Sequence, residues 1–270
     1  MELIDALILG LIQGITAFLP VSTSGHLVLV QQWLAVEGTN AVAFAALLHM
    51  ATATAVIVYF WSDLWVLMQA ALRKLSRLPV NEKDLRLFNA LALGTVPAII
   101  FALLFEPMFA VFFQNIALVA AMILVAAVFF MYVEWRYYLR PDHGGVTLRR
   151  GLLIGVFQAL SLIPGFSRSG ATIAGGMLLG MSRYEATRFS FLLAIPISLA
   201  IGSKKFIELL QSDGVINWTL IIVGAAVAAI SSLFVIHLFL GYIKNRTLWP
   251  YIWYSVLLSA FVGYAAFVTL

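Results

Sequence analysis

The chain has 270 residues, of which 63% are hydrophobic and only 10% are charged, and its formal net charge at pH 7 is +4. A soluble domain is about half apolar and about one-quarter charged, and it cannot bury so large an apolar fraction. The composition therefore excludes a soluble enzyme, a disordered chain and a nucleic-acid-binding module. It predicts an integral membrane protein with roughly six to nine crossings.

The first apolar region, residues 3–36, is interrupted between Leu19 and His26 by a proline, three hydroxyl residues and a glycine. Proline removes a helical hydrogen bond and glycine disfavours helix, so this region does not form a simple span. It predicts two short helices that enter the membrane and return to the same face. Their non-helical tip must be buried in protein or line a wet cavity.

Six other stretches are each long and apolar enough to cross a bilayer. They are residues 41–61, 87–105, 115–134, 186–203, 217–238 and 250–269. Residues 151–181 form a second interrupted region, with its break between Ile163 and Gly170. The sequence thus predicts an all-α polytopic membrane protein with six transmembrane helices and two re-entrant helical hairpins.

The two interrupted regions resemble each other when the sequence is offset by 145 residues. The most informative matches surround the breaks and pair Gly10 with Gly155, Gln13 with Gln158, Ser22 with Ser167, Ser24 with Ser169, and Gly25 with Gly170. We therefore expect one membrane domain over residues 1–270, built from two repeats at approximately 1–134 and 146–270.

Lys and Arg residues predict how the chain is oriented. Residues 62–86 carry five of them and residues 135–150 carry four, whereas the link 106–114 carries none. The positive-inside rule makes the two basic loops cytoplasmic. The first hairpin then enters from outside and the second from inside, so the repeats are inverted, an arrangement that places a binding site near mid-membrane. Lys204 and Lys205 fall outside, against the rule.

Arg168 is the most informative single residue, because it lies in a Ser-Arg-Ser-Gly turn at membrane depth. Insertion scales assign such an arginine a cost of about 2.5–3.5 kcal/mol, so it marks a candidate functional site. Its planar fork suits phosphate or carboxylate, and Ser167, Ser169 and Thr172 add hydroxyl donors. The alternative is an arginine that only extends to water at the interface. We expect an anion site.

The first break carries different chemistry, with Ser22, Thr23 and Ser24 directly before Gly25 and His26. A hydroxyl near an imidazole can be an activated nucleophile, and histidine can itself be the nucleophile or the general acid. The alternative is that these hydroxyls only cap helices or satisfy backbone groups. If this turn faces the arginine turn, the two together form a constellation suited to phosphoryl transfer.

Three other features have structural interpretations. His49 lies within a span and is expected to be a buried, hydrogen-bonded residue. Gly10 and Gly14 have the spacing of helix-packing glycines. Glu134 and Arg136 are expected to form an interfacial ion pair.

Residues Pro164 to Thr172, with the sequence PGFSRSGAT, closely resemble a motif of the undecaprenyl-diphosphate phosphatase family, the bacitracin-resistance membrane phosphatases. Residues Gln13 to His26 resemble the family's other motif, and the similarity covers the whole chain. The resemblance implies removal of the terminal phosphate of undecaprenyl diphosphate at the outer face of the bacterial plasma membrane. This reaction recycles the carrier lipid for cell-wall synthesis. The implied partners are that lipid and the membrane, without nucleic acid, and a homodimer is compatible with this reading.

The resemblance also assigns roles to individual residues. It implies that Arg168 is catalytic and holds the diphosphate, and that Thr23 and His26 lie at the scissile phosphorus, where most members have serine in place of Thr23. It implies that the remaining substrate-binding positions are Gln13, Ser22, Ser24, Gly25, Ser167, Ser169, Gly170 and Thr172.

Ala17 departs from the family pattern, because members carry a glutamate there that helps to hold a divalent cation, Mg²⁺ or Ca²⁺, or assists proton transfer. Alanine has no ligand atom, which leaves Gln13 as the candidate metal ligand. We therefore expect the chain to bind the lipid diphosphate but to hydrolyse it slowly or not at all. Ala17 is either an engineered substitution, which the otherwise intact motif favours, or a natural divergence, which Ala45 in place of a common acid slightly favours.

The main alternative function is transport. Inverted repeats with broken helices are a common plan of transporters, so a polyprenyl-phosphate flippase or another anion carrier fits the same architecture. Loss of an acid beside a retained anion cradle is the feature that most favours this alternative. Movement of the headgroup across a vesicle membrane without hydrolysis would distinguish it from a phosphatase.

Overall fold

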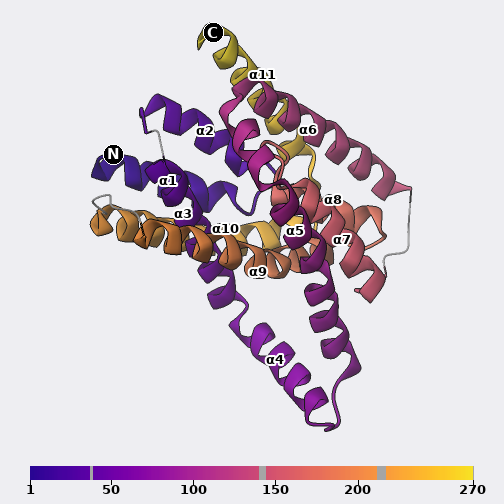
Figure 1. Ribbon diagram of the computed structural model, residues 1–270. Coiled ribbons are helices and arrows are strands. Elements are labelled where there is room, and N and C mark those ends of the chain that lie inside the picture. The colour runs from indigo at the N-terminus through magenta and orange to yellow at the C-terminus, as the bar shows by residue number, and fades with distance from the viewer. Residues whose placement is uncertain (37–38, 140–143, 212–216, 270) are drawn as a thin grey trace.

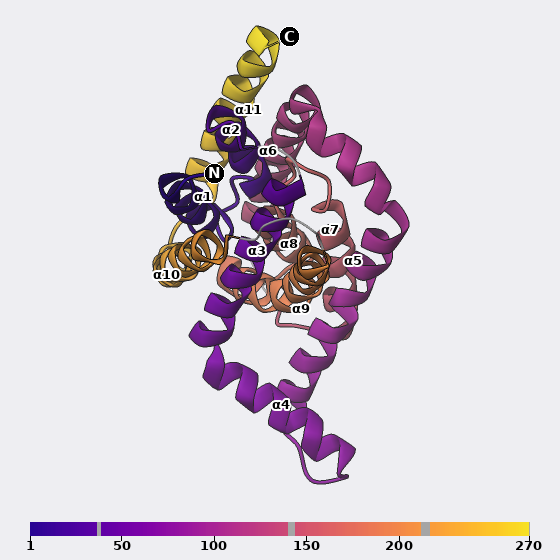
Figure 2. The ribbon, with the colours of Figure 1, turned by 60° about the vertical axis from the view of Figure 1, so that its left-hand side comes forward.

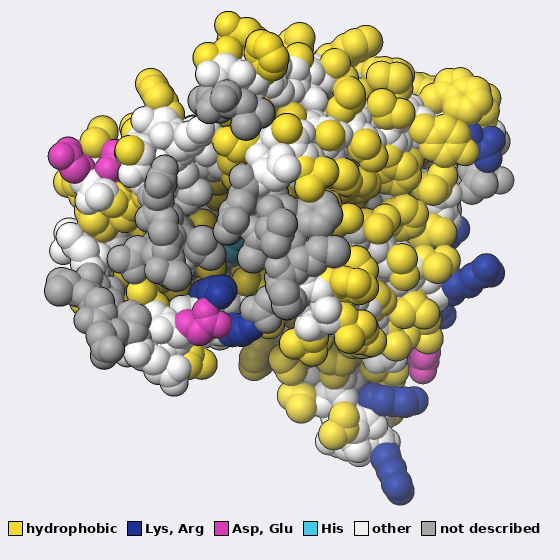
Figure 3. Space-filling view, turned by 45° about the horizontal axis from the view of Figure 1, so that its top comes forward, with side chains coloured by type: hydrophobic (Ala, Val, Ile, Leu, Met, Phe, Trp, Pro, Cys, Tyr) yellow, Lys and Arg dark blue, Asp and Glu magenta, His cyan; other side chains and the backbone are white. Residues whose placement is uncertain are grey.

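The computed structural model describes residues 1–36, 39–139, 144–211 and 217–269, and within these the side chains of 39–42, 106–114 and 269 are left undescribed. The described chain is helical, with no strand in these ranges. Five of its helices are long and apolar enough to cross a membrane, and a bent helix pair provides a sixth candidate. Apolar side chains are dense over the right-hand side of the face seen in Figure 3, as a lipid-facing surface requires. The protein is a multi-pass membrane protein.

The helices follow one another with short connections (Figure 1). In chain order they are α1 (Leu3–Thr16), α2 (Thr23–Trp33), α3 (Thr39–Tyr59), α4 (Trp61–Leu75), α5 (Glu82–Gln114), α6 (Ile116–Tyr138), α7 (Leu148–Leu160), α8 (Arg168–Leu178), α9 (Arg183–Leu210), α10 (Trp218–Ile243) and α11 (Trp249–Thr269). The six predicted spans correspond to α3, α5, α6, α9, α10 and α11, which confirms the predicted all-α polytopic fold. The interruptions fall between α1 and α2 and between α7 and α8.

The segment 62–86 is not simply a loop, because most of it is helical. The chain bends by 81° after α3 and continues as α4. Phe60 at the bend is buried, whereas Trp61, Trp65, Met68 and Leu72 are exposed along α4. These exposed residues recur at helical spacing, the pattern of an amphipathic helix at a membrane surface. The prediction treated the segment as a connection because of its charges, which lie mainly beyond the first turns of this helix.

Glu134 does not pair with Arg136, contrary to the sequence-based expectation. Its buried carboxylate instead pairs with Arg183, at the start of α9, with 2.5 Å between Nη2 and Oε1. The Arg183 guanidinium also lies over the ring of Tyr137, 3.9 Å from its centroid. Residues two apart point away from each other around a helix, so Arg136 cannot reach the side of α6 on which Glu134 lies.

Matched glycines bring two pairs of helices into close contact. A Cβ atom on Gly10 of α1 would lie 2.5 Å from the carbonyl oxygen of Gly224 in α10, and one on Gly155 of α7 would lie 2.2 Å from that of Gly94 in α5. Both crossings therefore require residues without side chains, as is common between membrane helices. The matched residues Gly10 and Gly155 thus both allow a close helix crossing. The two-repeat organisation itself stays a prediction.

The two interrupted hairpins approach the centre of the molecule from opposite sides. In Figure 1, α1 and α2 lie on the left and α7 and α8 lie on the right, with the two breaks between them. Figure 2 again shows α1 and α2 on one side of α3 and α7 and α8 on the other, and α3 packs against α9. The elements that carry the predicted site residues are therefore brought together by the fold.

We predict that Gly10→Ala lowers the thermal unfolding midpoint of the detergent-solubilised protein. The added methyl group would overlap the backbone of α10, and overpacking of this kind costs about 1–3 kcal/mol. Gly241→Ala is the matched control, because a Cβ there meets no atom within 4 Å. Equal midpoints for the two variants would contradict this account of the crossing.

Candidate functional site

The two breaks have the same local structure. We call residues 17–26 the first tip and residues 163–172 the second tip. Ser22 and Ser167 directly precede α2 and α8, and both have φ of 63°, in the left-handed region that serine rarely adopts. Each serine Oγ accepts a hydrogen bond from the backbone N–H three residues on, at 3.2 Å in both tips. Each tip thus presents a capped helix N-terminus, where partial positive charge favours an anion.

The two tips contact each other directly. The backbone N–H of Gly165 in the second tip donates to Ser24 Oγ in the first, at 2.9 Å. In return, Ser169 Oγ in the second tip donates to the carbonyl oxygen of Leu19 in the first, at 2.8 Å. The structure therefore brings together the two turns that the sequence predicted to face each other, and Ser24 and Ser169 hold them in place.

Arg168 begins α8 at this junction and has no acidic partner in the described part of the chain. Its Nη1 donates a hydrogen bond to Ser198 Oγ of α9. By contrast, Arg183 and Arg188 on α9 are both paired with carboxylates. A guanidinium carries five N–H donors, so most of those on Arg168 remain available to a ligand. The uncompensated charge makes this the candidate anion site.

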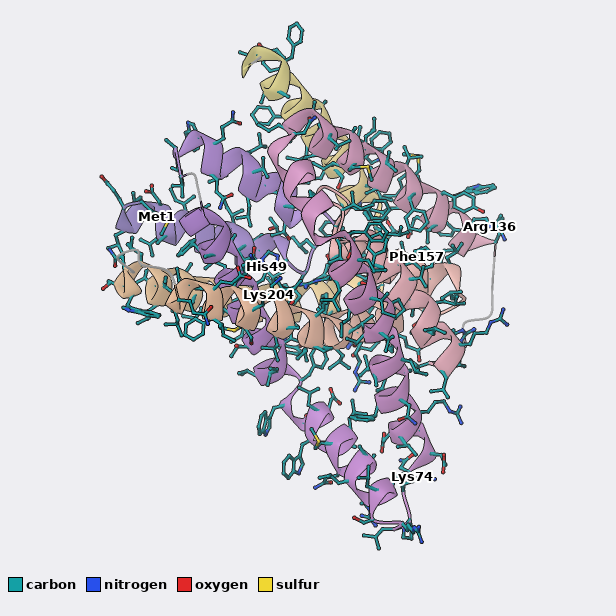
Figure 4. The ribbon with its side chains drawn as sticks, in the orientation of Figure 1. Met1, His49, Lys74, Arg136, Phe157 and Lys204 are labelled. Carbon is teal, nitrogen blue, oxygen red and sulfur yellow. The ribbon has the colours of Figure 1, made fainter. Side chains whose placement is uncertain are left out.

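His49 is a neighbour of Arg168 that the sequence did not connect with the site. It lies near the centre of the molecule on α3, as Figure 4 shows, and its Nδ1 donates to the carbonyl oxygen of Ala45 at 2.9 Å, so it is hydrogen-bonded as expected. The Arg168 charge acts electrostatically on its ring. Ser198 and His49 are polar residues within predicted spans. A polar side chain inside an apolar span is the only sequence feature that could have linked these two residues to the site.

The predicted site hydroxyls are not equally available to a ligand. Ser22 and Ser167 both cap helices, as the alternative interpretation of the first break expected for Ser22. Thr172 is buried, and its Oγ1 lies 2.8 Å from the carbonyl oxygen of Arg168 and 2.5 Å from the Ser190 hydroxyl. Thr23, the first residue of α2, makes no side-chain hydrogen bond to any described residue. Since Ser24 and Ser169 join the tips, Thr23 is the hydroxyl left free.

His26 is held in one orientation by two contacts. Its Nδ1 lies 2.8 Å from the carbonyl oxygen of Ser22, which can only accept, so the ring proton is on Nδ1. Its Nε2 lies 2.7 Å from the hydroxyl of Tyr254 in α11, and the two rings are stacked. His26 makes no hydrogen bond to Thr23 here. It borders a largely apolar cavity of about 410 Å³ that Leu19 and Tyr251 also line.

The glycines of the tips are explained by packing against α6. A Cβ on Gly25 would lie 2.6 Å from the Ile123 side chain, and one on Gly170 would lie 2.3 Å from the Phe130 ring. Both positions therefore need glycine whether or not a ligand is bound. Their assignment to substrate binding stays a prediction.

Comparison with known proteins gives a consistent result over nearly the whole chain. Residues 6–261 match the family model described as bacitracin resistance protein BacA. The chain belongs to the BacA family. Its relatives include an undecaprenyl-diphosphatase of Chloroherpeton thalassium, with 34% identity over 97% of this chain and 96% of the relative. Another relative, from Teredinibacter turnerae and also named undecaprenyl-diphosphatase, is 35% identical over 96% of this chain and 97% of the relative.

Two buried glutamines of this BacA-family chain lack partners. Gln13 in α1 and its match Gln158 in α7 are both fully buried, and no described residue bonds to the amide nitrogen or oxygen of either. A buried amide without partners costs about 1–3 kcal/mol, so each is satisfied only when water or a ligand reaches it. Gln13 was predicted as a site residue, whereas Gln158 was noted only as a repeat match.

The donor set of this BacA-family site does not fit a divalent cation held by the protein. Neither tip contains a carboxylate, and Ala17, where the family glutamate is expected, is a buried residue of the main hydrophobic core. No cluster of three or more His, Asp or Glu residues suited to a metal occurs in the ranges described. Mg²⁺ and Ca²⁺ require carboxylate oxygens in most protein sites, and the Gln13 amide with hydroxyls does not replace them.

We predict that Ser24→Ala and Ser169→Ala each lower the thermal unfolding midpoint, because each removes one hydrogen bond between the tips, worth about 0.5–1.5 kcal/mol. The double variant should lose less than the sum of the two, because either loss loosens the same junction. Thr95→Val is the control, since this buried hydroxyl bonds only within its own helix. Strictly additive losses would show that the two bonds act independently.

Proposed function

We propose that this protein is an undecaprenyl-diphosphatase that removes the terminal phosphate of undecaprenyl diphosphate at the outer face of the bacterial plasma membrane. The observation that carries this proposal is the unpaired Arg168 guanidinium at the junction of two helix N-termini. Such a centre is suited to a multiply charged phosphate group. The names of the relatives support the same reaction, and the multi-pass fold supports a lipid substrate.

Arg168 binds the diphosphate through charge-assisted hydrogen bonds, and the N-termini of α2 and α8 add backbone N–H groups. In a low-dielectric site these fixed dipoles stabilise the charge that develops on phosphate oxygens during transfer, without reorganisation. The hydrogen bond to Ser198 and the cap at Ser167 hold the arginine in place before substrate arrives. The cradle is therefore preorganised for binding.

Thr23 is the nucleophile in this proposal, because it is the site hydroxyl that no described residue engages. Its oxygen attacks the terminal phosphorus, and the bond from that phosphorus to the bridging oxygen breaks to release undecaprenyl phosphate. Water then hydrolyses the phosphothreonine to free phosphate. His26 lies one turn along α2 and takes the Thr23 proton at Nε2, once the Tyr254 hydroxyl has turned away.

The apolar cavity beside His26 supports a prenyl substrate over a small soluble phosphoester. Its lining is mainly hydrophobic, with Ile15, Leu19 and Val21 next to the histidine. An isoprenoid segment adjacent to the diphosphate would bury its apolar surface there, while the headgroup reaches the polar tips. The cavity volume of about 410 Å³ is within the usual range for small-molecule sites.

Transport of a polyprenyl phosphate or another anion is the second candidate function. One specific observation favours it: the tips retain the cationic cradle but contain no carboxylate to hold a cation or transfer a proton. Hairpins that approach the centre of the molecule from opposite sides are also suited to alternating access. Reconstituted vesicles distinguish the two, since a carrier would move labelled farnesyl phosphate between leaflets without releasing phosphate.

We predict that Ala17→Glu raises the rate of phosphate release from farnesyl diphosphate in the presence of Mg²⁺ by at least roughly tenfold over the unmodified chain. The added carboxylate would help to hold Mg²⁺, and a metal ion on the phosphate oxygens stabilises the transition state by several kcal/mol. Ala17→Gln is the matched control, with the same size but no charge, and should not increase the rate. If the unmodified chain and Ala17→Glu are both folded and neither releases phosphate, the phosphatase assignment fails.

We predict that Arg168→Ala weakens binding of farnesyl diphosphate by roughly tenfold to a hundredfold, the usual value of a hydrogen bond to a charged group. Arg168→Lys should recover part of this affinity, because it keeps the charge but not the fork. Arg246→Ala, which removes an exposed arginine of the α10–α11 loop, is the control. Unchanged affinity in Arg168→Ala would remove Arg168 from the site.

A further inference from the structure

A second cavity of about 460 Å³ lies away from the tips. It is formed at the bend between α3 and α4, against the start of α9 and the end of α10. The polar residues that line it are Tyr59, Asp63, Tyr184, Arg188, His237 and Lys244. None of them belongs to either tip, so this cavity is a separate feature of the molecule. It has no role in the reaction proposed above.

Charged groups in this cavity leave a positive excess. Asp63 is its one carboxylate, and it already pairs with Arg188, with 2.6 Å between Oδ1 and Nη2. That pair orients the guanidinium and leaves its other N–H groups free. Lys244 has no acidic partner among the described residues, and its Nζ lies 5.1 Å from the centroid of the Tyr184 ring. The cavity therefore holds two cations against one carboxylate.

Neutral donors complete the lining. His237 Nδ1 lies 3.3 Å from the hydroxyl of Tyr59, so the two side chains from α10 and α3 hold each other at the cavity wall. The phenol of Tyr184 makes no hydrogen bond to any described residue. An anion in this space would meet a guanidinium, an ammonium and phenol groups from different helices, which is the donor set typical of phosphate recognition.

The residues beside this cavity are those expected at the depth of lipid headgroups. The cavity is next to the first two turns of α4, where Trp61 and Trp65 are exposed, and such exposed tryptophans mark the interface between hydrocarbon and water. Figure 4 shows α4 leading from this region to Lys74 at its far end, well away from His49 and the tips. Phosphate groups of membrane lipids are the anions that are concentrated at this depth.

We propose that this cavity is a second phosphate-binding site, which takes the phosphate group of a lipid headgroup and is independent of the site at the tips. Its volume exceeds that of one phosphate and leaves room for the adjoining part of a headgroup. The proposal does not depend on the proposed hydrolysis, because it rests on different residues.

The test measures binding of farnesyl phosphate and of inorganic phosphate to the full chain carrying Arg168→Ala, in a non-ionic detergent, by calorimetry. This substitution removes the main cation of the tips. Farnesyl phosphate binding should persist in this protein. Adding Lys244→Gln should lower the affinity roughly threefold to tenfold. Adding Gly241→Phe should abolish binding, because Gly241 lines the cavity and a Cβ there meets no atom within 4 Å, so the ring fills the cavity. Arg246→Gln is the control, an exposed cation two residues from Lys244 that does not line the cavity.

The two probes distinguish the sources of the phosphate. Tighter binding of farnesyl phosphate assigns the site to a lipid headgroup, whereas equal binding of both probes assigns it to the free ion. The proposal is overturned if the Arg168→Ala protein binds neither probe. It is equally overturned if, in the Arg168→Ala protein, the Lys244→Gln and Arg246→Gln variants bind farnesyl phosphate with the same affinity. This comparison requires that Lys244→Gln leaves the thermal unfolding midpoint unchanged. Failure of the Arg168→Ala protein to bind either probe would not contradict the proposed hydrolysis, because hydrolysis is measured on the chain that retains Arg168.

Discussion

The guanidinium of Arg168 is a cation at membrane depth with no carboxylate among the described residues to neutralise it. A charge that is partly buried in protein is costly unless it is paired or serves a ligand, and Arg183 and Arg188 on α9 are both paired. The helix N-termini at the tips add further positive potential rather than compensating it. In the proposed function, a bound phosphate group offsets this positive charge.

The tips differ in burial although they share their local structure. In α8, every residue from Ser169 to Met177 is buried, whereas α2 buries only Gly25 and Leu27. The arginine therefore lies on a helix packed in the core, and Thr23 and His26 lie on a helix that is more exposed. This division suits a reaction in which one tip holds the phosphate and the other supplies the group that attacks it.

The family resemblance implies a glutamate at position 17, where this chain has alanine. The proposed anion cradle consists of Arg168, helix caps and backbone groups, and none of these needs a carboxylate at position 17. In this proposal, binding and turnover depend on different groups and are therefore separable. The cavity at the α3–α4 bend adds a second place where a phosphate can be held, at interfacial depth and apart from the tips.

Composition and hydropathy alone determined that the chain is a multi-pass helical membrane protein, because lipid requires long apolar helices, and proline with glycine determined where two of these helices break. The sequence also identified Arg168, since an arginine at membrane depth is exceptional. Only the tertiary structure decided that Glu134 pairs with Arg183, that α4 is a helix bent away from α3, and that Thr23 is the hydroxyl left free. These facts depend on contacts between residues far apart in sequence, and such contacts are set by how the helices cross, which local sequence patterns do not encode.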